Sequence, residues 1–354
     1  MPDPGPHRSH AELTAIFRHF ARHRCGRYAP LYARLGTAIA ADPALLTLAA
    51  CAPPGQSPPD LLLAAVHYLL ARCPGDPLAR HYPTLTSQPD PSDPVPPFRD
   101  FCHRHHGQLT SLIATRTVQT NEVRRCCYLL PAVVLAARHA RQPLALIEPG
   151  ASAGLNLALD RYAYHYGTAT PGPGPDAPLI LHCQLRGPHR PPPHQAMPSI
   201  RWRAGIDLHP LNPASPRDAA WLRALTWADH PSRITRLNHA LTAAAAGPAI
   251  PVHTGDAAEI LPALIAAAPA GLAVCVFHTA FLAHLPAARR QQFEHLVPAL
   301  SARRPVYWIQ AEPRSSPAEP RLRLTLCQHG QISSQWPLGH YHPHGAWLHW
   351  LTSS

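Results

Sequence analysis

The stretch IEPGASAGLNL, residues 147–157, carries residues that could do chemistry in two different ways. Gly150, Ser152 and Gly154 fit G-x-S-x-G, the turn that presents a nucleophilic serine in α/β-hydrolases. Together with Glu148 they also fit an acidic-x-G-x-S-x-G turn, which passes a nucleotide-like ligand over the start of a helix. The stretch therefore predicts either a serine hydrolase that uses Ser152 or a protein that binds a nucleoside cofactor.

The elements around this turn favour the cofactor. Residues 11–142 show helical spacing of apolar residues and no alternating run, so LALIE at 144–148 is the first predicted strand. A hydrolase would place several strands before its nucleophile. A turn after the first strand is instead where dinucleotide and methyl-donor folds bind their cofactor, at the topological switch point. Ser152 is therefore expected to let the backbone approach a cofactor, and the hydrolase is the weaker alternative.

Strands alternate with helices from residue 143 onwards, which indicates βαβ units and a mostly parallel sheet covered on both faces. The spacing predicts a helix directly after the turn, over GLNLALDRYAY. An insert at about 161–199 suggests a hairpin or a helix–strand excursion. The stretches RLRLTLCQHG and HGAWLHWLT are expected to close the sheet as an antiparallel pair. The sequence thus predicts an α/β domain at 143–354, preceded by an all-helical domain at 1–142 that covers the pocket.

Acidic residues end three successive predicted strands. Glu148 ends the first, Asp207 the second and Asp256 the third. The carboxyl ends of parallel strands meet at one edge of a sheet, where such folds use an acid to accept hydrogen bonds from ribose hydroxyls. We expect Asp207 to have this role and Asp256 to accept from an adenine amino group. For each aspartate, capping of the next helix is the alternative.

Residues 143–354 resemble the class I S-adenosylmethionine-dependent methyltransferases in the stretches EPGASAG, GIDLHP, GDA and VFHTAFLAHLP. The resemblance implies a Rossmann-like sheet with a terminal antiparallel strand pair, and S-adenosylmethionine as cofactor. It departs from the family at Ser152, where the family has its central glycine, and in the long insert. The cofactor-binding positions that it implies are Glu148, Gly150, Ala151, Ser152, Gly154, Asn156, Asp207, Asp256, Ala257 and Phe277.

Almost the whole chain also resembles the uncharacterised bacterial family known as domain of unknown function 2332. The stretches that carry this resemblance are QTNEVRRC, EPGASAGLNLALDRYAYHYG, GIDLHPL and VFHTAFLAHLP. The family name implies no assigned reaction. This resemblance therefore supports the fold more than the function.

Two further places carry candidate catalytic or binding groups. His278 follows the fourth predicted strand of this domain and is the candidate general base, since an imidazole titrates near neutral pH. The alternative is a histidine that is hydrogen-bonded at a strand end. Gln119, Asn121 and Glu122 are expected to close over the cofactor, with Glu122 a second catalytic candidate. An N-cap with its first turn is the alternative there.

Composition narrows the partners. The chain has 31 arginines, no lysine and 20 acidic residues, for a net charge of +11. The arginines are scattered, and the methyltransferases that act on nucleic-acid amino groups would carry an Asn/Asp-Pro-Pro-aromatic stretch that is absent here. We therefore expect a small or medium-sized acceptor and not a nucleic acid. A protein that binds the cofactor without catalysis is the alternative function.

Histidine, cysteine and hydropathy complete the expectations. The histidine-rich stretches CHRHH and HYHPHGAWLH lack structural-zinc spacing, so no physiological metal is predicted. The nine cysteines include no C-x-x-C pair, which indicates reduced thiols. No stretch approaches the ~20 apolar residues of a membrane span. A cytoplasmic protein is the expectation.

Overall fold

The computed structural model describes residues 8–119, 121–167, 177–192, 197–312 and 321–352. The chain divides into two compact units. Met1–Thr120 and Ser215–Asn238 form the first, which we call the helical unit. Asn121–Ala214 and His239–Ser354 form the second, which we call the sheet unit. This division differs from the predicted boundary at residue 142.

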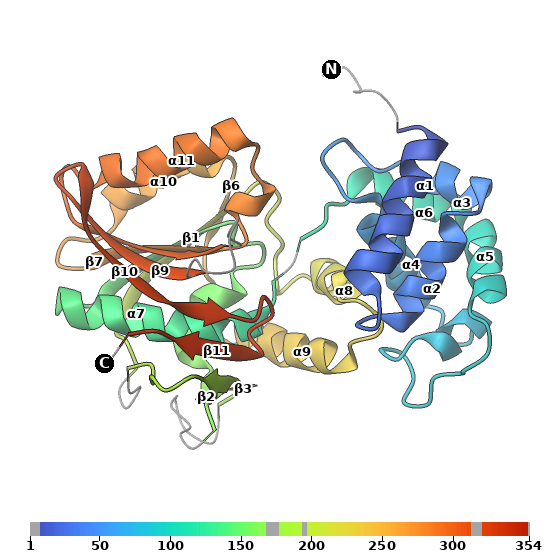
Figure 1. The fold of residues 1–354 in the computed structure, drawn as a ribbon, viewed down its shortest axis with the longest axis horizontal. Coiled ribbons are helices and arrows are strands. Elements are labelled where there is room, and N and C mark those ends of the chain that lie inside the picture. The colour runs from blue at the N-terminus through green and yellow to red at the C-terminus, as the bar shows by residue number, and fades with distance from the viewer. Residues whose placement is uncertain (1–7, 120, 168–176, 193–196, 313–320, 353–354) are drawn as a thin grey trace. The chain divides into compact units, whose positions relative to one another are not determined.

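The helical unit contains no strand among its described residues (Figure 1). The first helix begins with a capping box, in which the Ser9 backbone donates to Glu12 Oε2 at 2.7 Å and Glu12 N donates to Ser9 Oγ at 3.3 Å. Its helices are α1 (His10–His19), the π-helical turn η1 (Phe20–Cys25), α2 (Pro30–Ile39), α3 (Pro43–Ala49), α4 (Pro58–Leu70), the 3-10 turn η2 (Pro77–His81), α5 (Val95–Arg104), α6 (His106–Thr115), α8 (Pro216–Leu225) and the first part of α9 (Pro231–Ala246).

Side-chain contacts explain why Ser215–Asn238 belongs to the helical unit. The Asp229 carboxylate accepts from Leu31 N at 2.8 Å and Tyr32 N at 3.3 Å, so it caps the start of α2. Trp221 is buried, and its Nε1 donates to Thr117 O at 3.0 Å. These contacts join residues that are 104, 198 and 197 positions apart in the chain.

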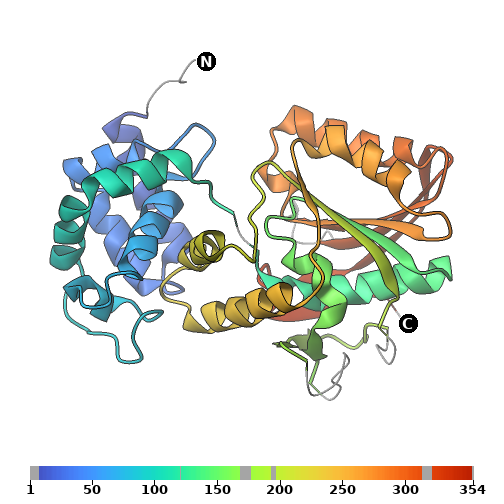
Figure 2. The same ribbon diagram turned by 180° about the vertical axis from the view of Figure 1, so that it is seen from behind.

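A large, mostly parallel sheet forms the sheet unit (Figure 1 and Figure 2). Its strand order turns back between β1 and β7, and ligands of open α/β sheets bind at such a switch point. The order is β4 (Gln184–Arg186), β11 (Trp347–Trp350), β10 (Gln331–Tyr341), β9 (Leu322–Gln328), β8 (Val306–Ala311), β7 (Ala273–Thr279), β1 (Leu144–Pro149), β5 (Ile200–Asp207) and β6 (Val252–Thr254).

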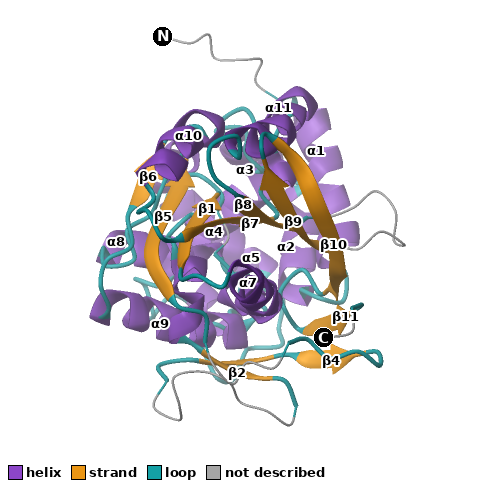
Figure 3. Cartoon of the chain, turned by 90° about the vertical axis from the view of Figure 1, so that its left-hand side faces the viewer, coloured by secondary structure: helices purple, strands orange, loops and turns teal. Residues whose placement is uncertain are grey.

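Helices cover both faces of this sheet (Figure 3). The helices α10 (Ala257–Ala267) and α11 (Ala287–Leu300) lie on one face, and α7 (Cys126–Ala140) lies on the other. Every residue of β1, β7 and β8 is therefore buried. Burial of one large aliphatic side chain such as Ile147 stabilises the fold by about 1.5–3 kcal/mol. Because α7 packs on the sheet, it belongs to this unit and not to the helical unit.

The end of the sheet differs from the predicted antiparallel pair. β9 and β11 do not pair with each other, because β10 lies between them and is antiparallel to both. A two-residue turn at His329 and Gly330, both with positive φ, joins β9 to β10. The sequence analysis missed β10 because its first half is largely exposed and polar and because Pro337 interrupts it.

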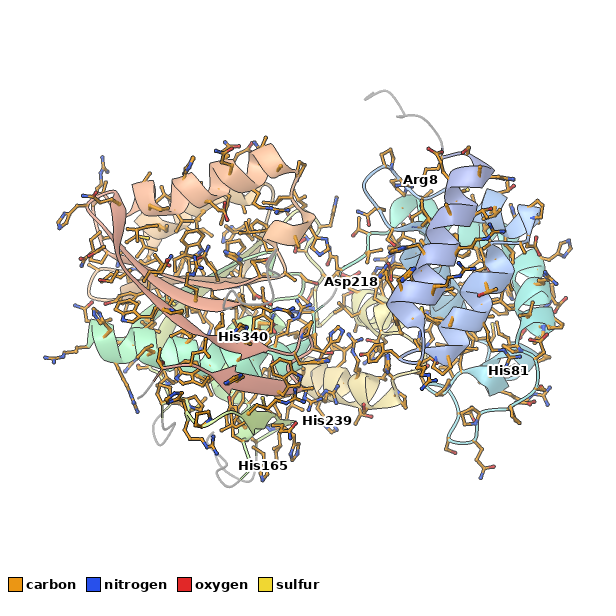
Figure 4. All side chains as sticks on the ribbon, viewed as in Figure 1. Arg8, His81, His165, Asp218, His239 and His340 are labelled. Carbon is orange, nitrogen blue, oxygen red and sulfur yellow. The ribbon has the colours of Figure 1, made fainter. Side chains whose placement is uncertain are left out.

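The segment after the Gly150 turn also differs from expectation. In place of a regular helix, it forms the short 3-10 helix η4 (Leu155–Arg161), followed by β2 (Ala163–His165). His165 in β2 is labelled in Figure 4. β2 pairs in parallel with β3 (Ile180–His182), and β4 joins the large sheet beside β11. The predicted insert is therefore a parallel strand pair with an added edge strand; its residues 168–176 and 193–196 lie outside the described residues.

Among the described helices, none is both long and apolar enough to cross a membrane.

Candidate functional site

The turn after β1 is built with left-handed backbone at three alternate positions. Gly150, Ser152 and Gly154 have φ values of 73°, 53° and 70°. A Cβ atom on Gly150 would lie 2.9 Å from Phe281 Cδ2, so only glycine fits there. A non-glycine residue such as Ser152 seldom adopts this conformation. The backbone at Ser152 is therefore held by its surroundings.

Asp207, at the end of β5, holds this turn. Its Oδ2 accepts from Ser152 N at 2.8 Å, and its Oδ1 accepts from His209 N at 2.9 Å. Leu208, which follows, is 58% exposed. Leu208 was not predicted as a site residue, although an exposed leucine beside a strand-end acid offers an apolar surface.

Glu148, at the end of β1, is 1% exposed. Its Oε1 accepts from Asn156 Nδ2 at 3.0 Å, whereas its Oε2 is buried without a partner among the described residues. Burial raises the pKa of Glu148 to about 8, against the opposing effects of the Asn156 hydrogen bond and the Arg125 charge. The carboxyl is therefore largely protonated near neutral pH. Asn156 is fixed in turn, because Cys126 Sγ donates to its Oδ1 at 3.5 Å.

The polar residues that precede α7 are only partly brought to the turn. Asn121 Oδ1 accepts from Leu155 N at 3.1 Å, which ties Asn121 to the helical turn after Gly154. Glu122 Oε1 accepts from Arg124 N at 3.3 Å and so caps the 3-10 turn η3 (Val123–Arg125), the alternative considered for it. Gln119 belongs to the helical unit, where its amide donates to Thr117 Oγ1 at 3.5 Å. Its contact with a cofactor stays a prediction.

Arg125 is a site residue that the sequence analysis missed. Its side chain is buried, its Nη1 donates to Thr279 O at 3.3 Å, and its Nε donates to Pro343 O at 3.2 Å. Tyr128, one turn further along, shares a 2.7 Å hydrogen bond with Thr279 Oγ1. Since the chain is rich in scattered arginines, nothing in the sequence marked this one.

His278 is fully buried, and both of its ring nitrogens are engaged. Nδ1 lies 2.7 Å from Glu312 Oε1, and Trp308 Nε1 donates to Nε2 at 3.0 Å. A nitrogen that accepts from an indole N–H carries no proton, so Nδ1 is the donor to Glu312. This neutral imidazole has no free lone pair to take a proton from a substrate. The geometry therefore matches the alternative, a histidine hydrogen-bonded at a strand end, and gives no support to a general base.

Glu312, directly after β8, anchors the loop that follows β7. Its Oε1 also accepts from Phe281 N at 2.8 Å and Leu282 N at 3.1 Å, and Phe281 packs on Gly150. Burial raises the pKa of Glu312, but the bonds from His278 and from this backbone outweigh burial, so its pKa lies below the usual value. The sequence analysis missed Glu312, yet it ends a strand as Glu148 does, and the same rule would have found it.

The remaining predicted positions serve the fold. Asp256 Oδ1 accepts from Ala258 N at 2.7 Å, and Asp256 Oδ2 pairs with Arg289, so Asp256 caps α10 as the alternative had it. Ala257 is buried in the core, and Phe277 is fully buried within β7. The geometry gives no support to contact between these residues and an adenine ring.

No group of three or more His, Cys, Asp or Glu side chains is placed to hold a metal ion within the part of the chain that the structure describes. His340, labelled in Figure 4, lies in β10, which ends at Tyr341. His342 and His344 follow that strand end, with ring centroids 5.7 Å apart. The three histidines therefore do not form the single extended segment on which a common face would depend.

Comparison with known proteins identifies a family and no single relative. Neither the curated proteins nor the solved structures include one that matches this chain. A family model matches residues 14–350, which includes nearly all of the helical unit and of the sheet unit. The chain therefore belongs to the family called domain of unknown function 2332 (DUF2332), described as an uncharacterized protein conserved in bacteria.

Proposed function

We propose that this protein binds S-adenosylmethionine at the carboxyl ends of β1, β5 and β7 and transfers its methyl group to a small or medium-sized acceptor. The observation that carries the proposal is Glu148. Its Oε2 is buried without a partner among the described residues, beside a glycine turn at the switch point of the sheet. Buried polar atoms are almost always hydrogen-bonded, so an orphaned one at this position indicates a ligand.

The order of the parallel strands supports a Rossmann-like, methyltransferase-like sheet. Numbered by their place in the chain, β6, β5, β1, β7 and β8 run in the order 3-2-1-4-5. Doubly wound nucleotide-binding sheets share this order, with the glycine turn after the first strand and an acid after the second. Gly150 and Asp207 occupy these two positions.

The residues at this edge suit a nucleoside. Asp207 ends β5, where such sheets use an acid to accept from ribose hydroxyls, and the exposed Leu208 offers an apolar surface to a base. Glycine and alanine at 150 and 151 let the backbone come close to the ligand. The cofactor would supply an activated methyl group, to which the acceptor's lone pair bonds as the carbon–sulfur bond breaks. Holding the methyl group and the acceptor in line supplies much of the rate acceleration of the transfer.

A protein that binds the cofactor without catalysis is the second candidate, and His278 favours it. The group predicted to take the acceptor's proton has both nitrogens engaged, so no base is identified near the acceptor. The hydrolase stays the weaker alternative. Ser152 follows the first strand of the described chain, and a seven-residue 3-10 helix follows it in place of a regular helix.

Calorimetric titration with S-adenosylmethionine, S-adenosylhomocysteine, NAD and ATP tests the proposal. We expect S-adenosylmethionine and S-adenosylhomocysteine to bind the wild-type protein. The substitution Asp207→Asn should weaken both affinities about tenfold, since hydrogen bonds to a charged group contribute about 1.5–3 kcal/mol. Asp93→Asn, which alters an exposed ion pair of the helical unit, is the matched control. Binding of NAD without either methyl-cofactor ligand would refute the proposal.

Transfer of an isotopically labelled methyl group separates the enzyme from the binding protein. The wild-type protein is incubated with labelled S-adenosylmethionine and a small-molecule extract of bacterial cells. Label that appears in a product and depends on intact Asp207 supports the methyltransferase. Tight binding with no transfer across fractionated extracts supports the second candidate.

A further inference from the structure

Arg125 carries a buried charge that has no counterion among the described residues. Its residue is 9% exposed, and among the described residues no carboxylate lies within ion-pair distance of its guanidinium. Its described partners are two backbone carbonyls, Thr279 O and Pro343 O, bound by Nη1 and Nε. Buried charges are normally paired, because loss of hydration costs several kcal/mol per ion. The arrangement therefore suits an anionic group from a ligand, since the described part of the chain supplies none.

The position of Arg125 relates this charge to the proposed cofactor site. Thr279 is the last residue of β7, and Glu148 lies at the end of β1, the neighbouring strand in the sheet. The Arg125 charge lowers the pKa of Glu148, as expected for groups at the ends of two neighbouring strands. A buried cation and a buried carboxyl with one unpartnered oxygen thus lie together at the switch point.

We propose that Arg125 and Glu148 recognise the α-amino-acid end of the cofactor, with the guanidinium binding its carboxylate and the Glu148 carboxyl accepting a hydrogen bond from its ammonium. This inference rests on the proposed function, since it names the part of S-adenosylmethionine that these residues hold. A guanidinium binds a carboxylate through paired N–H donors, which makes arginine better suited here than lysine. Glu148 Oε2 accepts an N–H from the ammonium, so both buried groups gain the partner that the chain lacks.

Two ligands that differ only in this end test the pair. S-adenosylhomocysteine carries the amino-acid group, whereas 5′-methylthioadenosine has the same nucleoside thioether without it. We expect Arg125→Gln to weaken S-adenosylhomocysteine about 10- to 100-fold, as for loss of a charged hydrogen-bonded pair, and to leave 5′-methylthioadenosine unchanged. Arg124→Gln is the matched control. The Arg124 side chain donates from Nε to His182 O at 2.7 Å, and we expect this substitution to change neither affinity.

The outcomes separate the two proposals. If the wild-type protein binds neither ligand, the proposed function fails. If it binds both and Arg125→Gln weakens both equally or neither, the function stands and the pairing is wrong. Unchanged affinity for 5′-methylthioadenosine also shows that the variant is folded. Should Arg125→Gln not fold, Arg125→Lys keeps the charge but loses the fork, and selective weakening of S-adenosylhomocysteine is still expected. If Arg125→Lys weakens both ligands by the same factor relative to the wild type, or weakens neither, the pairing is refuted.

Discussion

At the scale of single residues, the acids at the carboxyl edge differ in charge because their surroundings differ. Glu148 accepts one described hydrogen bond and keeps its proton near neutral pH, whereas Glu312 accepts three on one oxygen and ionises readily. Burial opposes charge at both positions, so the number of donors decides the outcome. The two buried carboxyls therefore differ in protonation near neutral pH, and the charged one anchors a loop.

The protonation of Glu148 predicts how stability depends on pH. Its folded pKa of about 8 exceeds the usual value of 4.5, so its contribution is fully present below about pH 4.5 and is lost as pH rises through 8. Glu148→Gln removes this loss. The difference in unfolding free energy between the variant and the wild type should therefore be a few kcal/mol more in favour of the variant at pH 9 than at pH 5. Urea unfolding of both proteins at pH 5 and pH 9 measures these free energies.

Glu294→Gln, on α11, serves as the control for that experiment, because its carboxyl lies on another element. We expect its unfolding free energy to follow the wild type at both pH values. The prediction is wrong if Glu148→Gln shows the same pH dependence as Glu294→Gln.

Ser152 gives a second prediction at this scale. Its φ of 53° suits glycine, so Ser152→Gly should hold the turn without strain and stabilise the protein by up to about 1 kcal/mol, while Ser152→Ala should not. Thermal unfolding measures both variants. As a cofactor turn, the serine should also stay unlabelled by a fluorophosphonate probe. Covalent labelling that disappears in Ser152→Ala would instead establish the hydrolase.

At the scale of elements, Glu312 links β8 to the loop after β7 through three donors. Glu312→Ala leaves His278 Nδ1 and two backbone N–H groups without their acceptor, and we expect it to cost about 3–5 kcal/mol, as when a buried partner is removed. Glu312→Gln keeps an oxygen acceptor and should cost less. Because the pKa of Glu312 lies below the usual value, its contribution is lost as pH falls below about 4.5.

Urea unfolding of these variants at pH 7 and at acid pH provides the measurement. Glu259→Gln, in the exposed part of α10, is a matched control that should leave stability near the wild-type value. If Glu312→Ala unfolds at the same urea concentration as the wild type, the loop does not depend on this carboxylate.

The elements also show what the sequence could and could not predict. β1, β7 and β8 were predictable because they are apolar runs, and β5 and β6 because each leads to a turn that carries an acid. β10 was not, since its exposed half follows no apolar alternation. Within the site, Glu148 and Asp207 followed from the rule for strand ends. Arg125 did not, because its importance comes from burial without a counterion, which only the packing reveals.

At the scale of the whole molecule, the helical unit depends on a segment far along the chain. Asp229 caps α2 through two backbone N–H groups, and replacing a capping side chain with alanine typically costs about 1 kcal/mol. We expect Asp229→Ala to increase hydrogen exchange at the Leu31 and Tyr32 amides. Asp229→Asn keeps an oxygen acceptor and should protect both amides better. Unchanged exchange in Asp229→Ala would contradict the capping role.

The order in which the two units alternate along the chain has a consequence for synthesis. Residues 121–214 leave the ribosome between the two segments of the helical unit, and the last strands of the sheet unit come later still. Neither unit can therefore be completed before part of the other has emerged. During synthesis, the segments that form α1–α6 lack their contacts with Trp221 and Asp229 until those residues emerge. We expect their apolar surface to stay accessible to chaperones until then. Slow translation across residues 121–214 would lengthen the time for which the first segment of the helical unit lacks the second.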